Sequence, residues 1–283
     1  MLRVVLDMKA AKEKEEKLIS SLGKLGSLAV AFSGGVDSTY LMMCAQKALG
    51  DKAIAVTANA PSFPDSELEK TREFTKAHGI RHRVAFTDEL SDEKFCLNTP
   101  DRCYICKKAI FTELLRVSLL EGAVHLAEGS NCDDLSDYRP GLIAVKELGV
   151  LSPLREAGLN KEEIRELSRD MGLPTWRKPS LACLATRIPY GEPITREKLD
   201  MIDAAENYLR SLGFEQLRVR HQGTTARIEL DRAEMGRVFS QDLGDKINEE
   251  LRGIGFAYVA LDLAGYRTGS LNETLRDDEK KSC

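Results

Sequence analysis

The stretch AFSGGVDST, residues 31–39, constrains the fold of this chain more than any other part of it. Apolar or small residues at 27–32 predict a buried strand that runs into this stretch, and an apolar helical pattern begins at Val36. A glycine-rich turn between a strand and a helix exposes backbone N–H groups, and the helix dipole adds partial positive charge. The sequence therefore predicts an anion site at the start of a helix.

The predicted anion site differs from a Walker loop. A Walker loop ends in Gly-Lys-Ser/Thr, whose lysine neutralises the β- and γ-phosphates, whereas this chain has Asp37 in the corresponding region. A γ-phosphate beside that carboxylate would be repelled unless magnesium intervened. The residues expected to bind the anion are Ser33, Gly34, Gly35, Asp37 and Ser38. The alternative is a plain turn in which Asp37 and Ser38 only cap the helix.

Strands and helices alternate along the first part of the chain. The expected strands are 28–32, 53–57, 81–86 and 124–127, and the expected helices are 36–49, 64–77, 103–120 and 161–171. This alternation predicts an α/β fold, a doubly wound parallel sheet that binds ligands at the carboxyl ends of its strands.

Beyond Pro179 the pattern changes to that of a smaller α+β unit. Its expected elements are a helix at 195–212 and strands at 217–221, 226–230 and 256–263. We therefore expect two domains, a doubly wound α/β domain at 1–180 and a smaller C-terminal α+β domain at 181–283.

Composition excludes several classes of protein. The 283 residues are 42% hydrophobic and 30% charged, which is ordinary for a soluble globular chain. The formal net charge of −4 gives no overall attraction to nucleic acid. The apolar run Leu2–Leu6 is short and interrupted by Arg3, so it matches neither a signal peptide nor a membrane span. We expect a cytoplasmic protein without a nucleic-acid or membrane partner.

Seven cysteines without an export signal favour thiol chemistry or metal binding over a disulfide framework. Cys103 and Cys106 form a CxxC at the start of a helix, where the dipole favours thiolates, and Cys183 lies at the domain junction. Three thiolates are one too few for a closed structural zinc site, but they would leave one iron of a [4Fe–4S] cluster open to bind sulfide. Two alternatives stay open, a redox CxxC and a zinc site completed by Cys96, Cys132 or a histidine.

Polar residues follow the strand expected at 124–127. Asn131, Asp133 and Asp134 are therefore expected at the carboxyl edge of the sheet, where a doubly wound fold binds its ligand. Asp37 and one of these carboxylates are candidates to hold Mg²⁺ between phosphate oxygens. The alternative is a polar turn exposed to water.

Two arginines alternate with apolar residues near the C-terminal part of the chain. Arg218 and Arg220 are expected on one face of a strand, with Leu217 and Val219 toward the core. Guanidinium groups about 7 Å apart along a strand can clamp a phosphate. The alternative is a solvated charged face with Glu229 opposite.

Five sequence segments, taken together, indicate one family. They are SGGVDS, CYICKK, EGSNCDDLSDYRPG, ACLATRIPYG and LDLAGYRTGS. The first resembles the signature of the PP-loop ATP pyrophosphatases, which cleave ATP between the α- and β-phosphates and adenylate a substrate. In order and spacing all five resemble the LarE family of ATP-dependent sulfur transferases, and they cover nearly the whole chain.

This resemblance implies a role for each domain, a substrate and a set of partners. Residues 1–180 would form the PP-loop ATP pyrophosphatase domain, and residues 181–283 would serve substrate binding or oligomerisation. The family adenylates a carboxylate of pyridinium-3,5-biscarboxylic acid mononucleotide, releases pyrophosphate and leaves sulfur on the substrate, for the nickel-pincer nucleotide of lactate racemase. It implies ATP and Mg²⁺ as cofactors, a homo-oligomer and a protein that donates sulfide. It also makes Arg139, Arg187 and Glu206 candidates for binding the substrate, beside Arg218 and Arg220.

Two sulfur chemistries occur in the family. One form converts its own cysteine to dehydroalanine in a single turnover, and the other carries three cysteines and uses a sulfide bound to a [4Fe–4S] cluster repeatedly. The sacrificed residue aligns with Ala182, while the three cysteines resemble Cys103, Cys106 and Cys183. We therefore favour the cluster form. Sulfide needs no general base near neutral pH, so no catalytic histidine is expected.

Two other functions remain open. A PP-loop tRNA thiolase combines a similar loop with a CxxC and a distant cysteine, but it would need an RNA-binding extension, and neither a basic domain nor a zinc ribbon is evident. A nucleotide-regulated metal-binding module would keep the loop and the cysteines but release no pyrophosphate.

Overall fold

The chain forms two compact units. The structure is a computed structural model that describes residues 7–136, 141–179, 182–240, 242–267 and 271. Unit 1 comprises Met1–Ala60, Asp65–Thr87 and Cys103–Leu181, and unit 2 comprises Pro61–Pro64, Asp88–Arg102 and Ala182–Cys283. Two short segments before residue 103 thus belong with the C-terminal part of the chain. The substrate-binding and oligomerisation roles of that part remain predictions.

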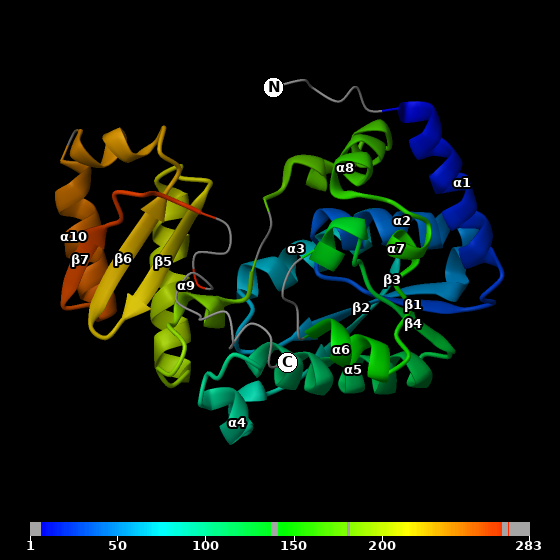
Figure 1. Cartoon of the computed structure of the whole chain (residues 1–283), viewed down its shortest axis with the longest axis horizontal. Coiled ribbons are helices and arrows are strands. Elements are labelled where there is room, and N and C mark those ends of the chain that lie inside the picture. Colours follow the sequence, from blue (N-terminus) through cyan, green and yellow to red (C-terminus); the bar gives the residue numbers. More distant parts are fainter. Residues whose placement is uncertain (1–6, 137–140, 180–181, 241, 268–270, 272–283) are drawn as a thin grey trace. The chain divides into compact units, whose positions relative to one another are not determined.

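Unit 1 is built on a four-stranded parallel sheet in the order β3-β2-β1-β4. Its strands are β1 Leu28–Ala31, β2 Ala53–Asn59, β3 Arg81–Phe86 and β4 His125–Ala127. Its helices are α1 Met8–Gly23, α2 Val36–Leu49, α3 Asp65–Ala77, α5 Arg102–Leu120, α6 Gly141–Glu147, α7 Pro153–Glu156 and α8 Lys161–Asp170, with the short 3₁₀ helices η1 Gly50–Lys52, η3 Cys132–Ser136 and η4 Pro174–Arg177. The sheet has α1, α2 and α8 on one side and α5 with α6 on the other (Figure 1). The predicted doubly wound α/β fold is confirmed.

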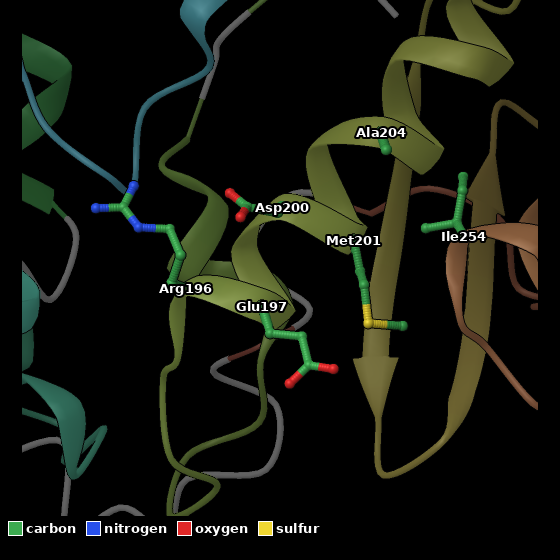
Figure 2. A pocket seen from close by; sticks show the side chains of 6 residues that line it. All are labelled: Arg196, Glu197, Asp200, Met201, Ala204 and Ile254. Carbon is green, nitrogen blue, oxygen red and sulfur yellow. The ribbon is translucent and has the colours of Figure 1, made fainter.

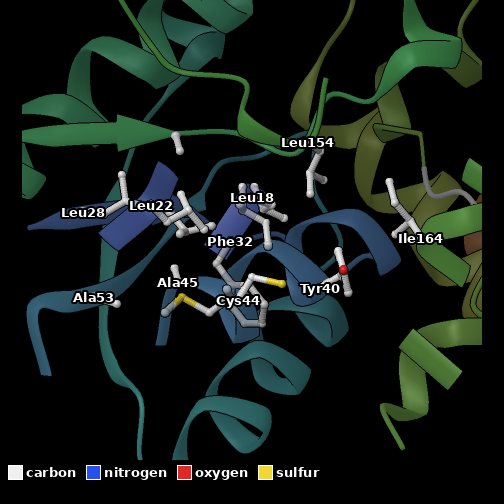
Figure 3. Close-up of a cluster of buried hydrophobic side chains, with 14 of the residues drawn as sticks. Leu18, Leu22, Leu28, Phe32, Tyr40, Cys44, Ala45, Ala53, Leu154 and Ile164 are labelled. Atoms are coloured by element: carbon white, nitrogen blue, oxygen red, sulfur yellow. The ribbon is translucent and has the colours of Figure 1, made fainter. Parts of the chain in front are cut away.

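The core of unit 1 explains why β1 is central. Leu28 lies opposite Ala53 of β2 and His125 of β4, and β1 is buried from Leu28 to Val30. Leu18 and Leu22 of α1, together with Tyr40 and Cys44 of α2, cover the sheet (Figure 3). A strand that is buried on both faces and paired on both edges holds its C-terminal end rigidly, and the phosphate loop begins at that end.

Local sequence sets the helix ends in unit 1. Asn160 accepts a hydrogen bond from the backbone N–H of Glu163, whose side chain accepts one from the backbone N–H of Asn160, which is a complete capping box at the start of α8. Gly50 ends α2 with φ 57°, in the left-handed region that glycine adopts without strain. Both helix ends were predicted from the sequence.

Unit 2 contains a three-stranded sheet in the order β5-β6-β7. β5 and β6 are antiparallel, whereas β6 and β7 are parallel. Its elements are η2 Glu89–Ser91, α4 Glu93–Cys96, η5 Leu184–Arg187, α9 Arg196–Ser211, β5 Leu217–Gln222, β6 Thr225–Leu230, η6 Met235–Phe239, α10 Leu243–Ile254 and β7 Tyr258–Leu261. Residues of α9 and α10 form one apolar core with β5 and β6, including Leu209, Val219, Ile228 and Leu251.

No helix within the described ranges is both long enough and apolar enough to cross a membrane.

A hydrogen-bonded chain ties the end of β1 to the neighbouring strands. Thr57 Oγ1 donates to the Phe32 carbonyl at 2.7 Å and lies 2.8 Å from His82 Nε2. Because the hydroxyl has one hydrogen and donates it to Phe32, the His82 ring must donate from Nε2. Burial, with the charges of Arg72 and Arg83, lowers the pKa of His82 to about 4. His82 is therefore neutral at neutral pH.

The lowered pKa of His82 predicts that the stability of the protein depends on pH. The unfolded chain binds a proton at His82 below a pKa of about 6.5, but the folded chain binds it only near its lowered pKa. Stability from this group is therefore complete above pH 6.5 and is lost as the pH falls toward 4. We expect His82→Gln to reduce the loss in unfolding free energy between pH 7.0 and 5.0 by about 1 kcal/mol, after allowance for solvent screening. Urea unfolding at both pH values measures it, and an equal loss in both proteins would contradict the assignment.

Candidate functional site

The phosphate loop connects β1 to α2 in unit 1. Gly35 is the N-cap of α2, and Gly34 has φ 66°, a left-handed conformation. A Cβ on Gly34 would lie 3.1 Å from Thr71 Cγ2, so a side chain there would be both strained and crowded. The hydroxyls of Ser33 and Ser38 lie 3.1 Å apart across the turn. The loop thus presents two hydroxyls and a helix N-terminus around a backbone that only glycine fits.

Asp37, in the first turn of α2, forms the acidic side of this site. Its carboxylate forms an ion pair with Lys161 Nζ, and its Oδ1 lies 3.4 Å from Asn131 Nδ2. A Cβ on Gly129 would lie 3.1 Å from the Ser38 nitrogen, so the turn after β4 approaches α2 as closely as glycine allows. The structure therefore brings Asp37 and Asn131 together, as their places at the carboxyl edge of the sheet predicted.

The other two predicted magnesium ligands hold the turn after β4. Asp133 Oδ2 accepts a hydrogen bond from the backbone N–H of Lys161 at 2.9 Å. Asp134 Oδ2 accepts one from the backbone N–H of Asn131 at 2.9 Å. In the described part of the chain no three His, Cys, Asp or Glu side chains form a group that could hold a metal ion. The magnesium role of Asp37, Asp133 and Asp134 remains a prediction.

Two lysines of the site, Lys161 and Lys178, were not predicted from the sequence. Lys161 is the first residue of α8, where the helix dipole disfavours a cation, so its position was a signal that a carboxylate compensates it. Lys178 follows η4, and its Nζ donates to the Gly34 carbonyl at 2.9 Å and to Glu67 Oε2 at 2.5 Å. No local pattern indicates that contact, because it joins residues far apart in the sequence.

The CxxC lies in the first turn of α5. Cys103 is half-buried and Cys106 is 8% exposed. Positions i and i+3 of a helix share one face, with Cβ atoms roughly 5–6 Å apart, so both sulfurs can serve one ligand. Cys183 belongs to unit 2, where it is half-buried and is the N-cap of η5. Within one unit, the structure thus groups two of the three predicted cysteines.

Arg102, which precedes the CxxC, was not predicted as part of the site. Its side chain is 1% exposed, donates from Nη1 to Asn98 and lies over the Tyr190 ring at 4.7 Å. Its Nε and Nη2 are buried and have no hydrogen-bond partner in the part of the chain that is described. Arg102 is therefore a buried cation of unit 2, whose given contacts are with Asn98 and Tyr190 of the same unit.

Arg187 and Glu206 form a buried ion pair in unit 2. Arg187 Nε and Nη2 donate to Glu206 Oε1 and Oε2 at 2.8 and 3.0 Å, and both side chains are at most 1% exposed. Arg187 Nη1 also donates to the carbonyls of Ala182 and Cys183. Burial raises the pKa of Glu206, but the charges of Arg187 and neighbouring arginines hold it below its ordinary value. These contacts give both residues a structural role, and the substrate role predicted for them is untested.

Arg218 and Arg220 are buried, at 8% and 7% exposed, so the alternative of a solvated charged face is wrong. Arg220 forms two hydrogen bonds with Glu229, at 3.0 and 2.9 Å, and a third with the Thr186 carbonyl. Arg218 lies over the ring of Tyr266 at 5.1 Å, and burial together with the charge of Arg187 lowers its pKa to about 10. Arg139, the remaining predicted substrate residue, lies outside the described residues.

A surface pocket of unit 2 contains none of the predicted site residues. Its lining comes from α9 and the end of α10 (Figure 2) and consists of Arg196, Glu197, Asp200, Met201, Ala204 and Ile254. The candidate site is therefore built on the phosphate loop and the cysteines rather than on this pocket.

Comparisons with known proteins give the chain a family. No family model matches it. It is 43% identical to an uncharacterized protein of Synechocystis over 93% of its own length and 98% of that protein. It is 39% identical to the pyridinium-3,5-bisthiocarboxylic acid mononucleotide synthase of Lactiplantibacillus plantarum, over 93% and 95% of the two chains. A glutamine-hydrolyzing GMP synthase chain of Archaeoglobus fulgidus is 26% identical, over 71% and 69%. Because the 39% identical synthase matches this chain along nearly its whole length, and because the chain has the loop between β1 and α2, it belongs to the LarE family of enzymes in the PP-loop ATP pyrophosphatase superfamily.

Proposed function

We propose that this enzyme transfers sulfur to pyridinium-3,5-biscarboxylic acid mononucleotide in a reaction that consumes ATP. One observation carries the proposal: the chain matches the L. plantarum synthase over 93% of its length. The loop of Ser33 to Ser38 supports the use of ATP, because its two hydroxyls and helix N-terminus suit a pyrophosphate.

The reaction needs ATP because a carboxylate resists nucleophilic attack. In the proposed mechanism a carboxylate oxygen of the substrate attacks the α-phosphorus of ATP, and the pyrophosphate leaves with the electron pair of the broken bond. A sulfur nucleophile then attacks the acyl carbon and AMP leaves. Sulfide and thiolate are strong nucleophiles near neutral pH, so no general base is required.

The loop residues bind the pyrophosphate in this proposal. Ser33 and Ser38 donate their hydroxyls, and the glycines bring backbone N–H groups close to the phosphate oxygens. Asp37 is the proposed protein ligand of the Mg²⁺ that accompanies ATP, and it would then exchange its ion pair with Lys161 for the metal. Asp133 and Asp134 are proposed to support this end of the site.

Sulfur is proposed to come from a [4Fe–4S] cluster held by Cys103, Cys106 and Cys183. The arrangement of two of these donors supports the proposal, because Cys103 and Cys106 share one face of α5 near its N-terminus. When bound, the cluster would offer one iron without a protein ligand for sulfide. Arg139, Arg187, Glu206, Arg218 and Arg220 are proposed to bind the substrate.

Iron content tests the cysteine ligands. We expect protein purified without oxygen to contain about four irons and four acid-labile sulfides per chain, and Cys103→Ala or Cys183→Ala to lose most of both. Cys132→Ala, at a half-buried cysteine outside the set, is the matched control and should keep its iron. Unchanged iron in Cys183→Ala would remove that ligand. Zinc in place of iron would contradict the cluster, as would a mass loss of about 34 Da at one cysteine after turnover.

Pyrophosphate release tests the reaction. The intact enzyme should release pyrophosphate only when ATP and the pyridinium mononucleotide are both present. Asp37→Asn should lower the rate at least about tenfold, because magnesium loses a charged ligand. Asp51→Asn, at an exposed aspartate of η1, is the control and should react at the normal rate. Release that is stimulated by tRNA alone would instead support an RNA-thiolating enzyme.

A variant of Glu206 distinguishes a structural role of the Arg187–Glu206 ion pair from a role in substrate binding. Glu206→Gln leaves a buried guanidinium without its charged partner, so we expect the free energy of unfolding to fall by about 3 kcal/mol. Glu215→Gln, at an exposed position, should have no comparable effect. Urea unfolding measures both variants. A Glu206→Gln protein of normal stability with a raised KM for the mononucleotide would show that Glu206 acts on the substrate instead.

A further inference from the structure

The phosphate loop lacks a lysine of its own, but the fold brings one to it. Lys178 lies on the chain after η4, and its Nζ donates to the carbonyl of Gly34 at 2.9 Å. Its side chain is 18% exposed. A cation is thus within one hydrogen bond of the turn that is expected to hold pyrophosphate.

The backbone of this lysine is fixed by neighbouring groups. Arg165 of α8 donates to the carbonyl of Trp176 at 2.6 Å and to the carbonyl of Lys178 at 3.0 Å. The Lys178 backbone N–H donates to the Thr175 carbonyl at 2.9 Å. The main chain is therefore held from two sides, and a flexible four-carbon stem joins it to the ammonium group.

A carboxylate on α3 holds the ammonium group beside the loop. Glu67 Oε2 accepts from Lys178 Nζ at 2.5 Å, and Glu67 Oε1 accepts from Lys70 Nζ at 2.8 Å. Burial raises the pKa of Glu67, but hydrogen bonds and charge from the two lysines hold it below its ordinary value. Glu67 thus stays ionised at neutral pH, and its charge repels a phosphate that enters the loop.

The loop and this ion pair are in close contact. A Cβ on Gly34 would lie 3.9 Å from Lys178 Nζ and 3.1 Å from Thr71 Cγ2, one turn along α3 from Glu67. Lys178 is therefore close enough to reach an anion held by the loop without movement of the helix. Lys161 pairs with Asp37 and serves that carboxylate instead.

We propose that Lys178 is a catalytic residue that binds the departing pyrophosphate, exchanging Glu67 for a phosphate oxygen. The proposal rests on the ATP-dependent reaction proposed above. As the bond between the α-phosphorus and the bridging oxygen breaks, the electron pair stays on the pyrophosphate, and the ammonium group stabilises that charge without transferring a proton. Lys178 supplies the cation that the loop lysine supplies in a Walker loop.

Binding of inorganic pyrophosphate to the full chain, measured by calorimetry in the presence of Mg²⁺, tests the proposal. Lys178→Met should weaken binding about tenfold, the effect of one lost charge-assisted hydrogen bond. Glu67→Gln should tighten binding several-fold, because the competing carboxylate is removed. Lys70→Met is the matched control, since it removes the other cation on Glu67, at a position where the side chain is 56% exposed, and it should bind normally. Lys178→Arg should bind more tightly than Lys178→Met.

Opposite effects of Lys178→Met and Glu67→Gln separate binding from structure. If both variants weaken binding equally, the pair only shapes the loop and the proposal is wrong. Normal binding by Lys178→Met, or no binding by the unaltered protein, would also overturn it. Because the measurement needs no sulfur substrate, a protein that binds pyrophosphate through Lys178 but does not thiolate the mononucleotide would refute the proposed function and leave this inference standing.

Discussion

The close approach of backbone segments at two glycines is the constraint on which the site depends. Gly34 lets the loop turn in a left-handed conformation against α3, and Gly129 lets the turn after β4 lie against the first turn of α2. A Cβ at either position would lie 3.1 Å from its nearest neighbour, so the neighbouring atoms would have to shift by a few tenths of an ångström. Asn131 lies beside Asp37, and Lys178 donates to the Gly34 carbonyl, within these two close approaches. The polar groups of the site are positioned by these contacts between backbones.

The sequence was sufficient for those parts of the structure that local physics determines. Alternating strands and helices, the loop between β1 and α2, and the capped start of α8 follow from periodicity, glycine and a capping box. Lys178 escaped prediction because its partners lie on α3 and in the loop. Arg218 and Arg220 were predicted to leave the core on one face, but β5 is buried on both faces. Alternation shows that two faces differ, and it does not show what covers each of them.

The buried charges of unit 2 connect its sheet to the segment that carries Cys183. Glu206 accepts hydrogen bonds from Arg187, Arg210 and the Val219 backbone, and Glu229 accepts them from Arg220 and Arg227. Such networks cost desolvation, and where their hydrogen bonds are satisfied they make the groups that they join more rigid. Because Arg187 also donates to the carbonyls of Ala182 and Cys183, the network fixes the backbone of the cysteine. Sulfur placement in unit 2 thus depends on ion pairs several residues away from it.

The two lysines of unit 1 follow one physical rule. Lys161 pairs with Asp37 and Lys178 pairs with Glu67, so neither partly buried cation lacks a counter-charge before a nucleotide arrives. Binding then exchanges one ion pair for another, and the desolvation that folding has already required is not repeated. The two exchanges differ in direction. Magnesium would displace Lys161 from its carboxylate, whereas pyrophosphate would draw Lys178 away from its own. A ligand that carries both charges, the magnesium complex of ATP, is therefore favoured over a bare metal ion or a bare phosphate.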